Sequence, residues 1–465
     1  MRKAQGFMSF SSIPFLFGFM PLFFLLYYLI PQRGRMVWIL LGSLVFYGWS
    51  CREAPWQFFL LLILVLMHFG LGWFVAGRWG LLALGLFVDF GLLFLYKYFA
   101  FFVNALLSAL GLPATLVAPA MPLGLSFFVF QGAAYLIDAY RGQLQETSLV
   151  RCGAFFLLFP HAASGPILRH DAMATQLSTP QVSLANVDRG LREFCIGLGL
   201  KVLLADRVGK LWQDAASIGY ESLSTPLAWM ALAAYSFQLY LDFYGYSRMA
   251  VGLGWMMGLE LPRNFSYPYT AHSMTEFWRR WHMSLSQWFR DYLYIPLGGS
   301  RCGMGKTLRN LLIVWLTTGL WHGAGWNFLL WGLVLFVLLA LEKLGLRRPL
   351  EAVPFLGRLY MLLAIPLTWL VFGLSDLSSL HTYLCRLFAV GGDFWGPFAQ
   401  DTWKYLGQYG LLLLLAALFS TPIPRRVYQR YAGRPWMALL LVAAFLFSFY
   451  CIYRGLSDPF LYFQF

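Results

Sequence analysis

Two histidines have the residue type and surroundings to carry out chemistry, and His322 is the first of them. It lies in an uncharged run, within the glycine-rich segment Gly319-Leu-Trp-His-Gly-Ala-Gly-Trp326. An ionisable side chain inside an apolar segment is costly, so it indicates a functional site. A low dielectric keeps an imidazole neutral and ready to accept a proton as a general base. The alternative is a packed histidine bonded to a neighbouring carbonyl, and the residues alone leave both interpretations open.

The second histidine, His282, lies 40 residues earlier in Glu276-Phe-Trp-Arg-Arg-Trp-His-Met-Ser-Leu-Ser-Gln-Trp-Phe-Arg-Asp291. If this piece is one helix, its apolar side chains form a single stripe, which is typical of a helix lying in a membrane interface. The stripe consists of Trp278, Trp281, Leu285 and Trp288. His282 then either takes part in the chemistry or sits on a solvated interfacial helix.

The composition identifies the environment in which these histidines must work. The chain has 465 residues, of which 60% are hydrophobic and 12% charged, whereas a soluble domain has about 25% charged residues. This is a membrane protein, and soluble enzymes and nucleic-acid-binding folds are excluded as its main body. The net charge of +14 is explained by cytoplasmic loops rich in Lys and Arg, which fix the orientation of a membrane protein. We therefore expect membrane lipid as a partner, and we do not expect nucleic acid. Scattered cysteines and histidines predict no metal site.

The elements that position the histidines are predicted to be membrane helices. Because a span takes about 20 apolar residues, we predict an all-α polytopic protein with about ten to twelve spans. The uncharged stretches are 4–32, 36–51, 54–77, 98–137, 222–241, 310–341, 359–375, 405–424 and 435–453.

Three segments do not fit uninterrupted spans. Prolines divide 98–137 into two helices, and Pro160, Gly165 and Pro166 interrupt 152–168. The stretch 310–341 would make a helix of about 48 Å, so we expect the glycine-rich piece around His322 to break it. Broken backbone at membrane depth occurs where it is buried in protein or lines a cavity. We therefore predict re-entrant elements around a central polar cavity.

Charge asymmetry predicts the sidedness of the loops. Region 263–310 holds seven cations, Arg263, Arg279, Arg280, Arg290, Arg301, Lys306 and Arg309, against two acidic residues. The positive-inside rule assigns it, and residues 425–434, to the cytoplasm. The loop 376–403 then faces outside.

Several motifs resemble one family closely. They are the Glu276-to-Ser286 segment, Arg290-Asp-Tyr-Leu-Tyr-Ile-Pro-Leu-Gly-Gly299, Gly319-Leu-Trp-His-Gly-Ala324, Leu123-Gly-Leu-Ser-Phe-Phe-Val-Phe-Gln131, Asp138-Ala-Tyr-Arg-Gly142, Phe159-Pro-His-Ala-Ala-Ser-Gly-Pro166 and Asp242-Phe-Tyr-Gly-Tyr-Ser247. The chain resembles the membrane-bound O-acyltransferase (MBOAT) family, in its bacterial branch that acetylates exopolysaccharides. The resemblance suggests one membrane-embedded domain over 1–465, with the family motifs in a core at 10–345 and additional spans at 346–465. It departs from the branch at Arg248, where an acidic residue is common.

The resemblance implies a helical fold around a tunnel, with His322 as the central catalytic residue and His282 as the second. It also implies a thioester donor from the cytoplasm, acetyl-CoA, with no bound cofactor. We expect Arg279, Arg280 and Arg290 to hold the donor phosphates through bidentate contacts, although loop topology explains these cations equally well. The remaining expected substrate-binding residues are Trp281, Trp321, Ser284 and Asp242.

The function implied is O-acetylation of a secreted exopolysaccharide of the alginate or cellulose type by a multi-pass protein of the bacterial inner membrane. The expected partners are a periplasmic acetyltransferase and the exopolysaccharide synthesis and export complex. Three alternatives stay open: transfer of D-alanyl or another acyl group to a cell-envelope polymer, a flippase for a lipid-linked sugar, whose broken helices would look similar, and a non-catalytic scaffold.

Overall fold

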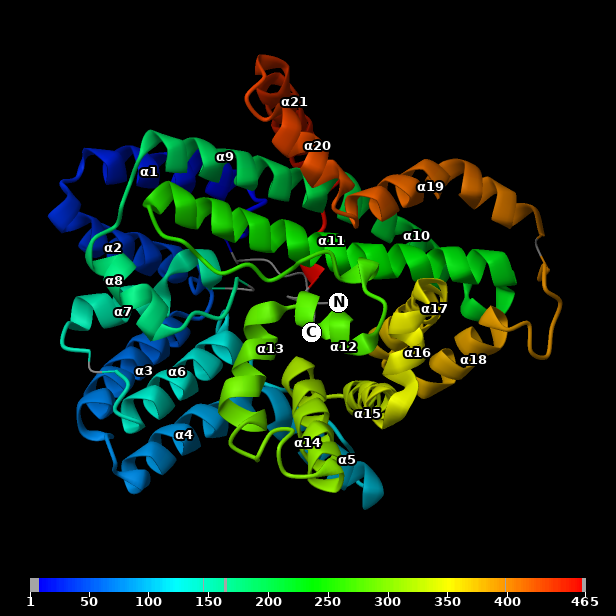
Figure 1. Cartoon of the computed structure of the whole chain (residues 1–465), viewed down its shortest axis with the longest axis horizontal. Coiled ribbons are helices and arrows are strands. Elements are labelled where there is room, and N and C mark those ends of the chain that lie inside the picture. The colour runs from blue at the N-terminus through cyan, green and yellow to red at the C-terminus, as the bar shows by residue number, and fades with distance from the viewer. Residues whose placement is uncertain (1–7, 145, 163–164, 398, 462–465) are drawn as a thin grey trace. The chain divides into compact units, whose positions relative to one another are not determined.

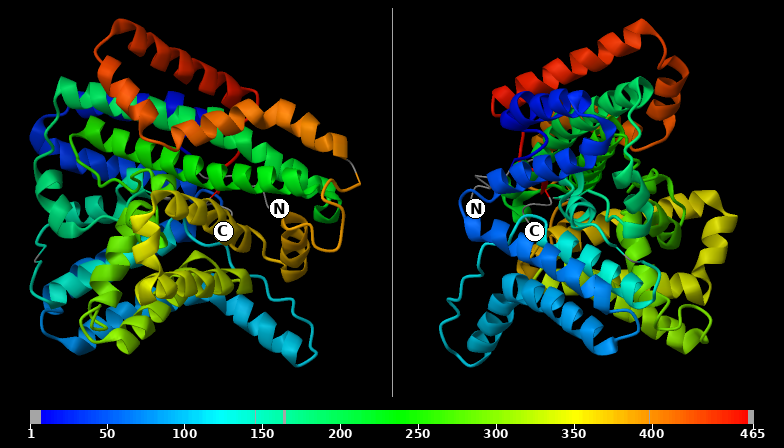
Figure 2. Two further views of the ribbon diagram at one scale, coloured as in Figure 1. Left: turned by 45° about the vertical axis from the view of Figure 1, so that its right-hand side comes forward. Right: turned by 90° about the vertical axis from the view of Figure 1, so that its left-hand side faces the viewer.

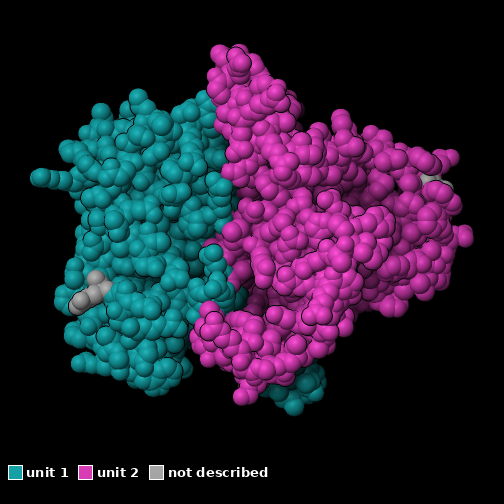
Figure 3. Space-filling view, in the orientation of Figure 1, with its two compact units in different colours: residues 1–194, 246–263, 287–292 teal, residues 195–245, 264–286, 293–465 magenta. Residues whose placement is uncertain are grey.

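The computed structural model describes residues 8–144, 146–162, 165–397 and 399–461. Every regular element within these ranges is a helix (Figures 1 and 2), which confirms the all-α prediction. Residues 4–7 of the predicted first span, and residues 163–164 of the interrupted segment, lie outside the described residues. The described chain forms two compact units (Figure 3). Whether they act as the single predicted domain stays a prediction.

Unit 1 comprises Met1–Phe194, Tyr246–Arg263 and Gln287–Tyr292. Its helices are η1 (Pro14–Phe19), α1 (Met20–Leu29), α2 (Gln32–Ser50), α3 (Pro55–Phe74), α4 (Trp79–Leu93), η2 (Phe94–Tyr98), α5 (Phe99–Ala109), α6 (Leu125–Tyr140), α7 (Leu149–Leu157), η3 (Phe159–His161), α8 (His170–Ser178) and most of α9 (Leu184–Gly199).

Unit 2 comprises Cys195–Gly245, Asn264–Ser286 and Leu293–Phe465. Its helices are η4 (Leu200–Ala205), α10 (Asp206–Ile218), η5 (Tyr220–Ser222), η6 (Pro268–Thr270), α12 (Met274–Arg280), α14 (Met304–His322), α15 (Trp326–Leu341), η8 (Glu342–Leu346), α16 (Arg347–Ala352), α17 (Pro354–Gly373), α18 (Leu377–Leu387), α19 (Ala399–Phe419), α20 (Ile423–Tyr431) and α21 (Pro435–Tyr453). The helices α11 (Thr225–Met257), α13 (Met283–Phe289) and η7 (Arg290–Tyr294) contribute residues to both units.

The predicted break of the 310–341 stretch is confirmed. Helix α14 ends at His322 and α15 begins at Trp326, and the two helices pack closely against each other as a helical hairpin. Glycines make this packing possible, because a Cβ at Gly319 would lie 2.3 Å from the Phe328 carbonyl oxygen and one at Gly332 would lie 2.4 Å from the Trp315 carbonyl oxygen. Small residues at such crossings let helix backbones approach closely.

The other two interruptions are also confirmed. Residues 98–137 divide into α5 and α6 with the proline-containing loop between them, and α7 ends at Leu157 before the short η3 turn. The loss of backbone donors at proline explains why neither stretch continues as one helix.

One apolar helix was not predicted as a unit. The helices α4, η2 and α5 follow one another directly and form one long apolar helix, Trp79–Ala109. Two charged residues, Asp89 and Lys97, interrupt the uncharged pattern of this stretch. Asp89 is fully buried and lies 3.0 Å from Nε2 of His68. A buried carboxylate is tolerated where it is hydrogen-bonded, so this charge does not mark a loop.

Five helices in the described residues are long and apolar enough to cross a membrane. They are Pro55–Phe74, Trp79–Ala109, Trp326–Ala352, Pro354–Gly373 and Pro435–Tyr453, and a sixth is possible if the bent pair Gln400–Phe419 and Ile423–Tyr431 forms one span. The count of about ten to twelve spans stays a prediction, and so does the sidedness of the loops.

Candidate active site

His322 is the last residue of α14, at the break between the hairpin helices. The residue is buried, with 8% of its surface exposed. The ring centroids of Trp331 and Phe372 lie 5.1 Å and 5.2 Å from that of the imidazole, both edge to face. The predicted placement of an ionisable group within an apolar setting is therefore confirmed.

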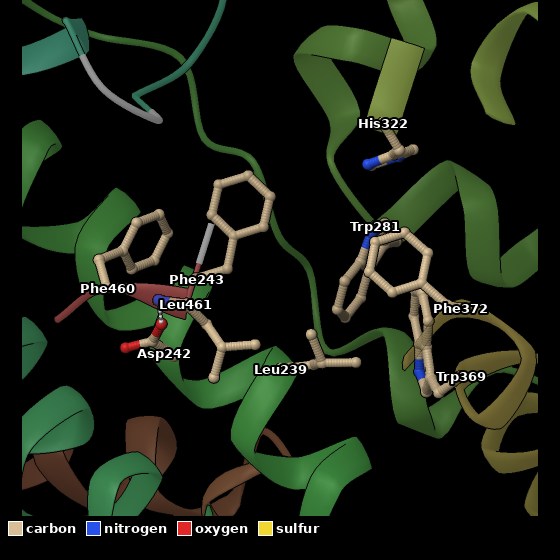
Figure 4. Close-up of a pocket in the computed structure, with 9 residues that line it drawn as sticks. All are labelled: Leu239, Asp242, Phe243, Trp281, His322, Trp369, Phe372, Phe460 and Leu461. Carbon is tan, nitrogen blue, oxygen red and sulfur yellow. Dashed lines mark hydrogen bonds between the residues drawn. The ribbon is translucent and has the colours of Figure 1, made fainter. Parts of the chain in front are cut away.

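The imidazole lines a cavity within unit 2 (Figure 4). The water-sized space in it is about 30 Å³, and its walls are formed by Leu239, Asp242, Phe243, Trp281, His322, Trp369, Phe372, Phe460 and Leu461. Three of the predicted site residues, His322, Trp281 and Asp242, meet here. The walls are otherwise aromatic and aliphatic. The polar cavity expected around the interrupted segments stays a prediction. The residues that interrupt 152–168 belong to unit 1 and do not line the cavity beside His322.

His282 is also buried, with 2% of the residue exposed. Its ring lies 4.8 Å, centroid to centroid, from that of Phe243, which lines the cavity. Trp321 connects the two histidines, since its ring lies 6.0 Å from that of His282 and 4.9 Å from that of His322. The rings of Phe243, His282, Trp321 and His322 thus form one aromatic cluster at the cavity.

The predicted interfacial helix over 276–291 is wrong. Helix α12 ends at Arg280 and α13 begins at Met283, because His282 adopts a left-handed backbone with φ of 42°. Left-handed residues other than glycine are uncommon and cannot continue a right-handed helix. The turn directs His282 inwards, so the solvated-helix interpretation of this residue is wrong as well.

Asn264 holds this turn and was not singled out in the sequence. Its carbonyl oxygen accepts a hydrogen bond from the Met283 amide at 3.0 Å. Its side-chain oxygen accepts from the Ser284 hydroxyl at 2.7 Å and from the Ser284 amide at 3.3 Å. The hydroxyl of Ser284, predicted to bind substrate, therefore positions the first turn of α13. Asn264 and Ser284 are 20 residues apart, so no local sequence pattern predicts their hydrogen bonds.

The start of α12 is fixed by a second unpredicted residue, Glu342. Its buried carboxylate accepts hydrogen bonds from the Met274 amide at 2.5 Å and from the Thr275 amide and hydroxyl at 2.9 Å and 2.7 Å. The N-cap Ser273 accepts from the Glu276 amide at 3.2 Å, and the Glu276 carboxylate accepts in return from the His272 amide. The Ser273 hydroxyl thereby satisfies an amide in the first turn that has no partner within the helix.

A buried charge cluster lies behind the cavity wall. Lys201, Asp206 and Asp242 are each 2% exposed, and the Lys201 ammonium contacts both carboxylates, at 3.1 Å for Asp242. Buried charges are stable only when they are paired and hydrogen-bonded. Asp242 was predicted to bind substrate, and its carboxylate is engaged by Lys201 and by the amide of Leu461 at 2.7 Å.

The three predicted phosphate-binding arginines are not gathered in one described cavity. Arg280 pairs with Glu276 and donates to the Thr270 hydroxyl at 2.8 Å. Arg290 belongs to unit 1, where its side chain is 67% exposed. Arg279 is exposed and lines a separate open cavity of about 320 Å³ with His272, Glu276, Arg347, Glu351 and Pro354. Within the part of the chain that the structure describes, no carboxylate forms an ion pair with Arg279.

Comparison with known proteins gives the family. The model of the membrane-bound O-acyltransferase family matches residues 127–355. The probable alginate O-acetylase AlgI of Pseudomonas putida is 35% identical over 497 residues, covering 98% of this chain and 100% of the relative. The peptidoglycan O-acetyltransferase of Helicobacter pylori is 34% identical, covering 72% of this chain and 70% of the relative.

A more distant relative is the teichoic acid D-alanyltransferase of Lacticaseibacillus rhamnosus, 29% identical over 59% of this chain and 77% of the relative. The match to AlgI extends through 346–465, beyond the region where the motifs carried the resemblance. The chain belongs to the membrane-bound O-acyltransferase family and is a multi-pass membrane O-acyltransferase.

Proposed function

We propose that this protein supplies acetyl for the O-acetylation of a secreted exopolysaccharide of the alginate type, taking it from acetyl-CoA at the cytoplasmic side of the bacterial inner membrane. The observation that carries the proposal is the similarity to a probable alginate O-acetylase over 98% of this chain and 100% of the relative. The relative with a D-alanyl activity is less similar and covers less of the chain. An acetyl donor also suits the small cavity beside His322. Alginate is favoured over cellulose because the full-length relative acts on alginate by name.

In the proposed step, His322 acts as the base. Its imidazole accepts the proton of an acceptor hydroxyl as the hydroxyl oxygen attacks the thioester carbonyl. The new C–O bond forms, the C–S bond breaks, and the departing thiolate takes the proton back from the imidazolium. General-base assistance of this kind contributes about 10²–10⁴ in rate. The apolar walls support this role, because electrostatic effects are stronger where water is excluded.

Arg279 is the arginine with the most suitable setting for the donor phosphates. It is exposed in an open cavity, whereas Arg280 is paired within the protein. A guanidinium binds phosphate oxygens in a bidentate manner. We propose that Arg279 contacts the pyrophosphate of coenzyme A.

The acetyl group is proposed to pass first to an extracytoplasmic partner, a periplasmic acetyltransferase associated with the polymer's export complex. The 376–403 loop contains only the short helix α18 as a described regular element before α19, and it offers little surface for a polysaccharide. A hydrated glycan would lose hydrogen bonds to water on approaching His322, at about 1–3 kcal/mol for each unpaired buried group. A single hydroxyl on a flexible partner segment avoids most of this cost.

The proposal is tested with purified protein, radiolabelled acetyl-CoA and alginate. We expect little polymer acetylation by the protein alone and a large increase when the candidate periplasmic partner is added. Butyryl-CoA and D-alanyl thioester serve as competing donors. Transfer of D-alanine in preference to acetyl would contradict the donor, and efficient alginate acetylation by the protein alone would contradict the relay.

Replacing His282 by alanine is expected to lower acetyl transfer strongly and to leave a measurable remainder. In the proposed site His282 orients Trp321 and the donor, and a positioning group is less costly to lose than the base. A conservative His282→Asn variant should recover part of the rate if orientation by a hydrogen bond is the role. Initial rates at varied acetyl-CoA check this, and wild-type rates in both variants would remove His282 from the mechanism.

A further inference from the structure

The segment Ser457–Leu461, which follows α21, is attached to the buried charge cluster of unit 2. The Asp206 carboxylate accepts hydrogen bonds from the Ser457 hydroxyl at 2.8 Å and from the Asp458 amide at 3.3 Å. The Asp242 carboxylate accepts from the Leu461 amide at 2.7 Å. Lys201 provides only one positive charge to the two carboxylates. The segment therefore supplies the hydrogen bonds that two buried carboxylates require.

This attachment places two apolar side chains in the wall of the cavity. Phe460, which is 1% exposed, and Leu461 both line it. In Figure 4 they lie on one side of the cavity with Phe243 and Asp242, while His322, Trp281 and Phe372 lie on the other. The ring of Phe460 lies 6.0 Å, centroid to centroid, from that of Phe243. The segment thus limits the space that extends from His322.

The remaining space is small. A water molecule needs about 10–15 Å³ of space measured in this way, so a cavity of about 30 Å³ has room for about two. This is close to the size of an acetyl group. Further methylenes of a longer acyl chain that extends toward this wall would press against Phe460 and Leu461. Hydrophobic pockets discriminate by about 10–200-fold for one methylene.

We infer that Phe460 and Leu461 determine the length of the acyl group that the enzyme transfers, and that Lys201, Asp206 and Asp242 hold them in place. The inference rests on the proposed function, because it assigns this cavity to the acyl group of the donor. It gives the buried charge cluster a role as a positioning device for the cavity wall.

The test compares rates of transfer from acetyl-CoA, propionyl-CoA and butyryl-CoA. Wild-type protein is expected to use acetyl in preference to butyryl. Leu461→Ala and Phe460→Leu are expected to raise the butyryl-to-acetyl ratio by about tenfold. Leu461→Val removes less volume and should give an intermediate ratio. Leu461→Phe should slow acetyl transfer by filling the cavity.

Leu456→Ala is the matched control. Leu456 belongs to the same part of the chain, is 37% exposed and does not line the cavity. The butyryl-to-acetyl ratio of this variant should therefore equal that of the wild type. Variants are compared only when they elute as folded, monodisperse protein. An unchanged ratio in folded Leu461→Ala, Leu461→Val and Phe460→Leu would overturn the inference and leave the proposed function intact. Absence of transfer from every thioester by the wild type would overturn both.

Discussion

Replacing His322 by alanine is expected to lower acetyl transfer by about 10²–10⁴-fold, the contribution of the proposed base. The protein should still accumulate in the membrane, because the imidazole packs against Trp331 and Phe372 and contributes one of many aromatic contacts. The measurement is the initial rate of acetyl transfer from acetyl-CoA, normalised to the amount of folded protein.

Two further variants separate chemistry from packing. His322→Gln keeps a polar side chain of similar length without the basicity, and it should be as inactive as His322→Ala. His381→Ala is the matched control, because His381 is an exposed histidine on α18 and its loss should leave the rate unchanged. Substantial activity in His322→Gln would show that the residue is not the base.

Replacing Lys201 by alanine is expected to lower the free energy of unfolding by about 3–5 kcal/mol, the usual cost of removing one partner of a buried ion pair. The substitution removes the ammonium that pairs with the Asp206 and Asp242 carboxylates and leaves both carboxylates buried. The variant should accumulate at a small fraction of the wild-type level and unfold at a lower temperature in detergent. Thermal unfolding followed by intrinsic tryptophan fluorescence measures the change.

A double variant tests the electrostatic cause. Lys201→Met combined with Asp242→Asn removes one charge of each sign and should recover part of the stability that either substitution alone loses. Lys343→Ala is the control, because Lys343 is an exposed lysine in η8 and its removal should change the unfolding temperature little. Equal unfolding temperatures for Lys201→Ala and wild type would contradict the structural role of the cluster.

The sequence by itself determined the class of the protein, its family and the identity of its most suggestive residue. Membrane helices carry all their backbone hydrogen bonds within one segment, so length, charge and proline spacing predict where they break. The break at His322 was predictable because a run of small residues in an overlong apolar stretch is a local property of the chain. The family motifs are local as well, and they extend across most of the chain.

Only the tertiary structure decided how the site is assembled. The periodicity of 276–291 predicted one helix, but Asn264 holds a left-handed turn at His282 through hydrogen bonds that sequence spacing does not encode. The buried carboxylate of Asp89 lies within an apolar helix, beside His68 from 21 residues earlier in the chain. The Asp242 carboxylate accepts a hydrogen bond from the Leu461 amide, 219 residues later, and so holds Leu461 in the wall of a cavity that His322 also lines. In each case a long-range polar partner offsets the cost of burial, and pairing of that kind is set by the folded chain.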